Sequence, residues 1–216
     1  MPHFTTLRTV MVDTQVRPSD VTTYSIIEAL LSVPRECYVP DHLRAVAYTG
    51  ENLPIGPNRV ILDPRSFAKL LDALAIRKDE LALDIGCGYG YSAAVIAHLA
   101  DAVIAVEGPG MAEEAEQRLS RQSVDNAVVL AADLTAGAPK HGPYDVIVIE
   151  GAVEDVPPQI VDQLKEGGRI GALFMERNLG VARIGYKVDG AISWRPAFNA
   201  SAPVMSDFTA PRAFAL

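Results

Sequence analysis

The sequence has few cysteines, no excess of basic residues and no long apolar run. Cys37 and Cys87 have no partners at metal-ligand spacing, so we expect two free thiols in a reducing compartment, the cytoplasm. The formal net charge of −8 and a pI near 5.0 argue against nucleic acid as a partner. No run reaches the length of a membrane span, and the first residues lack the apolar segment of a signal peptide, so we expect no membrane association.

What the sequence does contain is enough apolar material for one packed domain. Apolar residues make up 49% of the 216 residues, too many for a disordered chain. Short apolar runs alternate with amphipathic segments, which predicts an α/β fold with a doubly wound, mostly parallel sheet and helices on both faces. We expect a single domain over 1–216, with a helical cap and Pro/Gly-rich arm over 1–80, a Rossmann-like core over 81–175, and antiparallel strands over 176–216.

The expected elements follow from the spacing of apolar residues and from Pro and Gly. Core strands are expected at 81–85, 102–106, 127–130, 144–150 and 169–174, helices at 21–32, 66–74, 92–100, 111–122 and 157–165, and antiparallel tail strands at 181–187, 192–195 and near 208–214.

A glycine-rich loop follows the first core strand. Gly86, Gly88 and Gly90 come directly after the apolar run 81–85 and before a helix of small residues. Glycine allows positive φ and lets a ligand approach bare backbone, and this order of elements is typical of nucleotide-binding folds. A dinucleotide fold would carry the spacing G-x-G-x-x-G, whereas here the third glycine comes one residue early. The spacing therefore disfavours a NAD-dependent oxidoreductase.

Three acidic residues stand at the ends of the first three core strands. A carboxylate at Asp84 would repel a pyrophosphate but attract an amino-acid ammonium, which favours S-adenosylmethionine as the ligand. Glu107 is placed to bind both ribose hydroxyls, and Asp133, next to Leu134, to accept from the adenine amino group. The predicted cofactor-binding residues are Asp84, Gly86, Gly88, Gly90, Glu107, Asp133 and Leu134.

Longer stretches of the sequence resemble the protein-L-isoaspartate O-methyltransferase family. The resemblance covers roughly residues 33–173 and rests on VPRECYVP followed by LRAVAY, on LPIG and on DIGCGYGYSAAVIAHLA. The segment from AADLTAGAPK to LKEGGRI is similar to the later half of the family, almost without gaps. The resemblance implies an S-adenosylmethionine-dependent enzyme that methylates the free carboxylate of L-isoaspartyl residues in a peptide or protein, so that the ester can cyclise and be repaired.

The stretch after LPIG departs from the family's pattern. The family typically reads TISQP there, with its serine beside the reacting carboxylate, and this chain reads VILDP. Leu62 takes the place of the serine, and Asp63 brings a negative charge beside it. Where the family has TAAA, this chain has Glu150 followed by GAV, so we expect weak isoaspartyl activity. The expected substrate-side residues are Ile61, Leu62, Asp63, Ala152 and Val153.

No residue is predicted to act as a catalytic base. A carboxylate substrate is already ionised at pH 7, so the enzyme needs only to align it with the methyl donor. His98 and His141 are expected to be structural, and no nucleophile-plus-base pair is evident. A nucleic-acid methyltransferase is disfavoured by the charge and by the lack of an N/D-P-P-Y/F loop after the fourth core strand. The remaining alternative is a relative that keeps the cofactor site but acts on another carboxylate, or on none.

Overall fold

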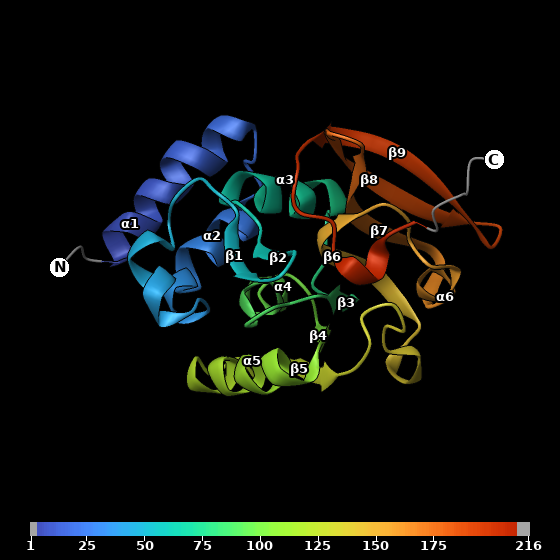
Figure 1. Cartoon of the computed structure of the whole chain (residues 1–216), viewed down its shortest axis with the longest axis horizontal. Coiled ribbons are helices and arrows are strands. Elements are labelled where there is room, and N and C mark those ends of the chain that lie inside the picture. The colour runs from blue at the N-terminus through green and yellow to red at the C-terminus, as the bar shows by residue number, and fades with distance from the viewer. Residues whose placement is uncertain (1–3, 211–216) are drawn as a thin grey trace.

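A seven-stranded sheet forms the centre of the computed structural model, which describes residues 4–210 (Figure 1). Its strand order is β5-β4-β3-β6-β7-β8-β9. The strands from β3 to β7 are parallel, while β8 and β9 join antiparallel at one edge. The prediction of a doubly wound sheet with antiparallel C-terminal strands is therefore confirmed. The strands are β3 (Leu81–Ile85), β4 (Ala102–Glu107), β5 (Ala127–Ala131), β6 (Tyr144–Val153), β7 (Leu164–Glu176), β8 (Leu179–Val188) and β9 (Ala191–Asn199).

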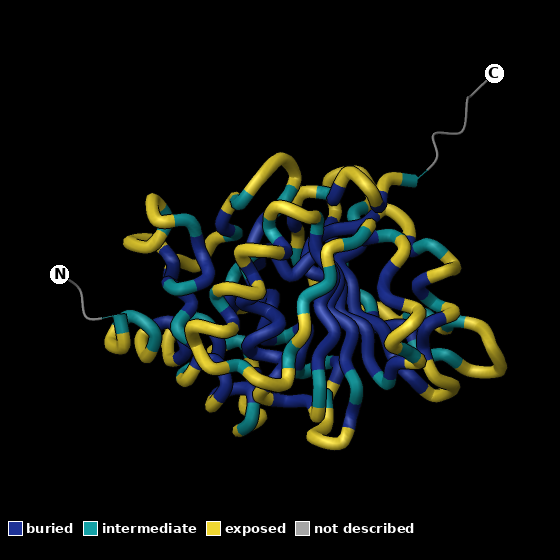
Figure 2. Tube along the Cα trace, turned by 90° about the horizontal axis from the view of Figure 1, so that it is seen from below, coloured by how far each residue is buried: buried dark blue, intermediate teal, exposed yellow. Residues whose placement is uncertain are grey.

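Side chains of the central strands alternate between two apolar layers, and the strands themselves are the most buried part of the chain (Figure 2). In β3, Ala82 packs in the first layer and Leu83 in the second. Successive side chains of a strand point to opposite faces. Asp84 therefore points to the first layer, and the same alternation in β4 and β6 places Glu107 and Glu150 on that face.

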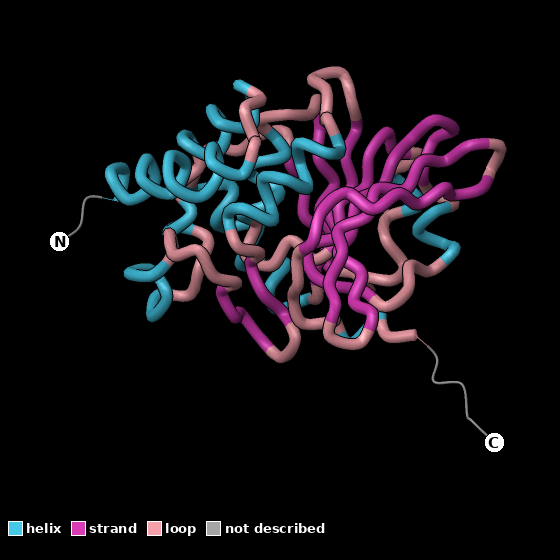
Figure 3. The backbone as a smooth tube through the Cα atoms, turned by 90° about the horizontal axis from the view of Figure 1, so that it is seen from above, coloured by secondary structure: helices cyan, strands magenta, loops and turns pink. Residues whose placement is uncertain are grey.

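Helices cover the first layer, whereas the second is covered mainly by short segments (Figure 3). Pro64, Pro109 and Pro158 open three of the helices, at the position where a missing N–H costs no hydrogen bond. No helix within residues 4–210 combines the length and apolar character that a membrane span requires. The helices are α1 (Phe4–Met11), α2 (Tyr24–Ser32), α3 (Pro64–Leu74), α4 (Tyr91–Ala97), α5 (Pro109–Arg121) and, in the second layer, α6 (Pro158–Val161).

A separate two-stranded hairpin reaches the glycine loop. Its strands, β1 (Leu53–Gly56) and β2 (Arg59–Ile61), pair antiparallel with each other and lie outside the main sheet. The turn between them contains Asn58 at φ +53, a conformation that asparagine tolerates better than most residues. This hairpin brings residues of the N-terminal arm to the carboxyl ends of the core strands.

Several local expectations are corrected by the structure. The helix expected over 157–165 covers only Pro158–Val161, because Leu164 already pairs with Tyr144 as the first residue of β7. The Pro/Gly-rich arm, where no strand is expected, contains β1 and β2, and the helical cap begins earlier than residue 21, with α1 followed by a π-helical turn. Of the strand expected near 208–214, Phe208 instead ends a 3₁₀ turn, and residues 211–214 lie outside the described part of the chain.

Candidate active site

Asp84 lies at the carboxyl end of β3 and is entirely buried. Ser92 Oγ donates a hydrogen bond of 2.7 Å to Asp84 Oδ2, whereas Oδ1 has no hydrogen-bond partner among residues 4–210. The pKa of Asp84 is raised to about 7, mainly by burial; the Ser92 hydrogen bond opposes the rise and the charge of Glu107 adds to it. A buried acceptor without a partner is unusual in a folded protein and fits the binding of a cation or a hydrogen-bond donor.

The three loop glycines adopt the backbone conformation that favours glycine. Their φ angles are +83° at Gly86, +57° at Gly88 and +94° at Gly90. A Cβ atom on Gly88 would lie 2.6 Å from Cδ1 of Ile55, on the hairpin. The sequence therefore uses glycine here both for the turn and for close contact with the hairpin.

Glu107 ends β4, is fully buried and holds the loop in place. Its carboxylate accepts hydrogen bonds from the backbone N–H of Gly88 at 2.7 Å and of Gly108 at 2.8 Å. Both of its oxygens also accept from the guanidinium of Arg59, at 2.8 and 2.5 Å. Arg59 Nη2 donates as well to Gly86 O at 3.0 Å, so Arg59 joins the hairpin to the glycine loop and to β4.

A cavity of about 400 Å³ opens beside this ion pair. The volume lies within the usual range for small-molecule sites, and ligands of open α/β sheets bind at this carboxyl edge. Asp133 at its rim accepts from the Thr135 N–H and hydroxyl, and the hydroxyl hydrogen bond is the main cause that lowers the pKa of Asp133. The cavity is lined by Arg59, Glu107, Gly108, Pro109, Met111, Ala132, Asp133, Leu134 and Asp207.

The structure thus brings three of the predicted cofactor residues, Glu107, Asp133 and Leu134, to one cavity. Asp84 and the loop glycines do not line it. Gly86 lies next to the cavity, beneath the guanidinium of Arg59, and Asp84 is enclosed at the end of the neighbouring strand. No group of three His, Cys, Asp or Glu side chains within residues 4–210 is arranged to hold a metal ion.

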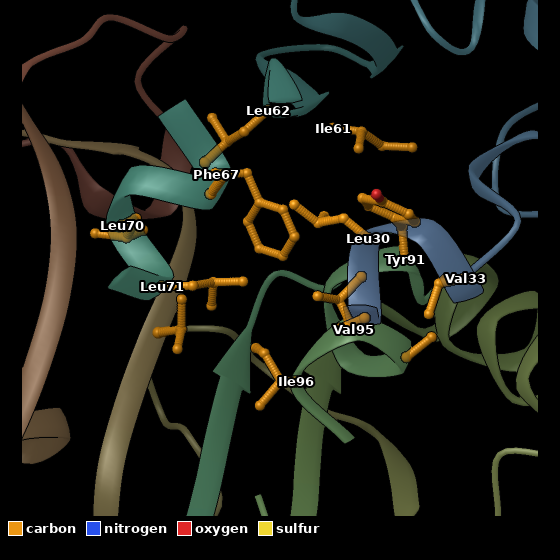
Figure 4. Close-up of a cluster of buried hydrophobic side chains, with 14 of the residues drawn as sticks. Leu30, Val33, Ile61, Leu62, Phe67, Leu70, Leu71, Tyr91, Val95 and Ile96 are labelled. Carbon is orange, nitrogen blue, oxygen red and sulfur yellow. The ribbon is translucent and has the colours of Figure 1, made fainter. Parts of the chain in front are cut away.

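The three substrate-side candidates of the arm, Ile61, Leu62 and Asp63, serve core packing and helix capping in this structure. Ile61 and Leu62 are buried in the apolar cluster that Figure 4 shows, Leu62 with only 1% of its surface exposed. Asp63 caps α3, since its Oδ1 accepts from the Ser66 N–H at 2.9 Å. Neither Leu62 nor Asp63 lines the cavity at Glu107.

Ala152 and Val153 are likewise enclosed, with no exposed surface. They continue β6 and pair with Leu173 and Phe174 of β7. The segment after β9 then covers them, because Met205 N donates to Ala152 O at 2.9 Å. A substrate role for these two residues stays a prediction.

Glu150 is a buried acid that precedes these residues in β6. From the sequence, it is noted only as a departure from the family's TAAA pattern. Its side chain is on the same sheet face as that of Asp84, from the neighbouring strand β6. Its Oε1 has no hydrogen-bond partner within the described residues. Burial, and secondarily the charge of Asp84, raise the pKa of Glu150 well above its usual value.

Arg59 is the residue of the site that sequence reasoning missed. The signal in the sequence is weak, because a lone arginine in a Pro/Gly-rich arm is most often a solvated surface charge. Recognising the turn at Pro57 and Asn58 would have placed Arg59 on a hairpin opposite Gly56. Nothing in the sequence indicates that this hairpin folds onto Glu107.

The comparisons with known proteins identify the family. The profile of the protein-L-isoaspartate(D-aspartate) O-methyltransferase family (PCMT) matches residues 8–190. The chain belongs to this family. Curated relatives named protein-L-isoaspartate O-methyltransferase include one from Methanoculleus marisnigri, 38% identical over 161 residues, which are 74% of this chain and 73% of that protein. Another, from Methanocella arvoryzae, is 46% identical over 142 residues, 64% of this chain and 76% of that protein.

Solved structures agree on the fold. A protein-L-isoaspartate O-methyltransferase superposes with a TM-score of 0.80 at 23% identity, covering 96% of this chain and 67% of that one. A Plasmodium falciparum protein described as PCMT, in complex with S-adenosyl-L-homocysteine, gives a TM-score of 0.79 at 18% identity, covering 96% of this chain and all of that one. At such identities the likeness concerns the fold, and it confirms the Rossmann-like architecture.

The PCMT match includes every predicted site residue as well as Arg59 and Glu150, all of which fall within residues 8–190. It ends before β9, so Asp207 at the cavity and Met205 over β6 come from a segment beyond the match. The residues predicted to bind the cofactor thus lie within the matched segment, whereas part of the cover of the cavity does not.

Proposed function

We propose that this protein transfers a methyl group from S-adenosylmethionine to the free carboxylate of L-isoaspartyl residues in peptides or proteins, a repair reaction. The observation that carries the proposal is the cavity of about 400 Å³ at the carboxyl ends of parallel strands, lined by Glu107 and Asp133, in a member of the PCMT family. Relatives that are 38% and 46% identical to this chain over the aligned residues carry the name of this activity.

The residues present fit the proposed cofactor. Glu107 would hold the ribose hydroxyls, and Asp133 and Leu134 would meet the adenine, since all three line the cavity. The partnerless Oδ1 of Asp84 and the bare backbone at Gly86 suit the positively charged amino-acid end. When bound, S-adenosylmethionine supplies an activated methyl group on its sulfonium.

The chain's own residues then have little acid–base work to do. An isoaspartyl carboxylate is ionised at pH 7 and is itself the nucleophile. The protein has to hold one carboxylate oxygen in line with the methyl group and to exclude water, which is a matter of positioning. Asp84, Glu107 and Glu150 are buried, so these three acids are shielded from bulk solvent before a ligand arrives.

We also infer that the chain works as a single methyltransferase domain in the cytoplasm. One apolar cluster runs from Met11 through the core strands to Ala202, which supports a single cooperative unit. Cys37 and Cys87 are both free thiols, which suits a reducing compartment.

A second candidate is a relative that binds the same cofactor but methylates a different acceptor. Two observations favour it: Leu62 is a core residue that offers no donor, and Glu150 adds a buried acid near Asp84. An anionic acceptor would then meet an apolar side chain and a buried acid where the family offers hydroxyl groups.

Methyl transfer from labelled S-adenosylmethionine to an isoaspartyl peptide, with its aspartyl isomer as control, separates the two candidates. The proposed function predicts labelling of the isoaspartyl peptide alone. Labelling of neither peptide by a protein that binds the cofactor would favour the second candidate.

A further inference from the structure

Glu107 has all four of its acceptor positions in use. Oε1 accepts from Arg59 Nη1 and from Gly108 N, both at 2.8 Å. Oε2 accepts from Arg59 Nη2 at 2.5 Å and from Gly88 N at 2.7 Å. A carboxylate has about four lone-pair sites, so no position is left for a ribose hydroxyl. The two backbone donors are fixed by the loop and the strand end, which leaves Arg59 as the partner to be displaced.

The turn next to Arg59 is held less tightly than the rest of the hairpin, whose Leu53, Val60 and Ile61 are buried in the core. The hairpin pairs only with itself, and its turn residues, Pro57 and Asn58, are exposed. One long hydrogen bond of 3.4 Å, from Asn58 Nδ2 to Ser206 Oγ, joins the turn to the segment after β9. Arg59 Nε is buried and has no hydrogen-bond partner among residues 4–210. A buried donor without a partner is costly, so this position of Arg59 leaves binding capacity unused.

A cation stabilises a bound carboxylate, and the charges of two guanidinium groups, those of Arg35 and Arg59, act on the buried acid Glu150. Arg35 is held by two backbone carbonyls, because its Nε and Nη2 donate to Ala47 O and Leu62 O, both at 2.8 Å, while its Nη1 is buried without a partner within residues 4–210. Its guanidinium also lies 4.7 Å from the centre of the Tyr91 ring. Arg59 is held instead by Glu107, the carboxylate expected to bind the cofactor's ribose. Arg59 also lies three positions before Leu62 in the chain.

We propose that Arg59 is a substrate-positioning residue that the free enzyme holds on Glu107 and that cofactor binding releases to bind the substrate carboxylate. The substrate half of this proposal rests on the proposed function above. A bidentate guanidinium–carboxylate pair would replace the donor that the family's serine provides and that Leu62 lacks. Binding would be ordered, with the cofactor first. Because coupling between sites is reciprocal, the isoaspartyl substrate would also tighten the cofactor's binding.

Calorimetry with S-adenosylhomocysteine tests the half that concerns Glu107. Arg59→Gln should bind this ligand about tenfold more tightly than the unaltered protein, because the competitor for Glu107 is gone. Arg8→Gln is a matched control, since Arg8 is also paired with a buried glutamate and is 12% exposed against 11% for Arg59. It should leave the affinity unchanged. Equal or weaker binding by Arg59→Gln overturns the proposal.

Binding of an isoaspartyl peptide tests the substrate half on the unaltered protein, where misfolding of a variant plays no part. The peptide should bind at least tenfold more tightly with saturating S-adenosylhomocysteine than without it, and equal binding overturns this half. In kinetics, Arg59→Gln should raise KM for the peptide about tenfold or more with a smaller change in kcat, and Arg59→Lys should recover part of the loss. An unchanged KM also overturns it.

Failure of the proposed function gives a different result. If the unaltered protein neither binds nor methylates the isoaspartyl peptide, the proposed function and the substrate half are refuted together. The comparison of S-adenosylhomocysteine affinities still decides whether Arg59 competes for Glu107.

Discussion

Replacing Asp84 with asparagine should remove a pH-dependent loss of stability from the free protein. Burial raises the folded-state pKa of Asp84 from 3.8 to about 7. Between about pH 4 and pH 7 the folded protein therefore keeps a proton that the unfolded chain has released. The free energy of unfolding falls as the pH rises through this window and levels off above it. The full rise in pKa corresponds to about 4 kcal/mol, an upper value for one carboxyl group.

Urea unfolding of the unaltered protein and of Asp84→Asn between pH 4.5 and pH 8 measures this effect as the difference between their free energies of unfolding. Asparagine has the shape of aspartate and can still accept from Ser92, so Asp84→Asn should gain up to about 3 kcal/mol relative to the unaltered protein between pH 4.5 and pH 8. Glu80 and Asp145, whose pKa values are lowered, act in the opposite sense but are present in both proteins. A difference that is constant with pH would show that Asp84 is ionised in the folded state and would refute this reasoning.

Three further substitutions test the site and its supports. Glu107→Gln should weaken S-adenosylhomocysteine binding by about 2 kcal/mol in calorimetry, because it removes charge-assisted hydrogen bonds to the ribose, and an unchanged affinity would exclude that role. Leu62→Ser should lower the free energy of unfolding by about 2–4 kcal/mol in urea denaturation, since Leu62 is core, and a stable variant with raised isoaspartyl activity would contradict this placement. Asp63→Ala should cost about 1 kcal/mol by loss of the α3 cap, whereas Asp63→Asn should cost little, and equal losses would argue against capping.

The core of the fold could be predicted from the sequence because its signals are local. The apolar run before Gly86 and the one before Glu107 are each bounded by turn residues, and both form strands within a residue of the expected ends. The acids at those ends face the same layer because strand side chains alternate with a period of two. Family membership was also predictable, since the motifs extend over most of the chain in order.

The rest depends on contacts between segments far apart in the sequence. That Arg59 pairs with Glu107, across 48 positions, follows from how the hairpin folds onto the sheet. Leu164 joins β7 because it pairs with Tyr144, which overrides the helical pattern around it. The position of Leu62 in the core similarly depends on α3, whose Phe67 belongs to the same cluster. The resemblance to the family therefore drew attention to Leu62 but could not predict its surroundings.

Calorimetric titration of the free protein with S-adenosylhomocysteine, and separately with NADH, tests most directly whether the strand-end acids form a cofactor site. The account predicts binding of S-adenosylhomocysteine in the micromolar range, about −8 kcal/mol, and no binding of NADH. Binding of NADH without any binding of S-adenosylhomocysteine would contradict it, because the cavity at Glu107 and Asp133 would then belong to a dinucleotide.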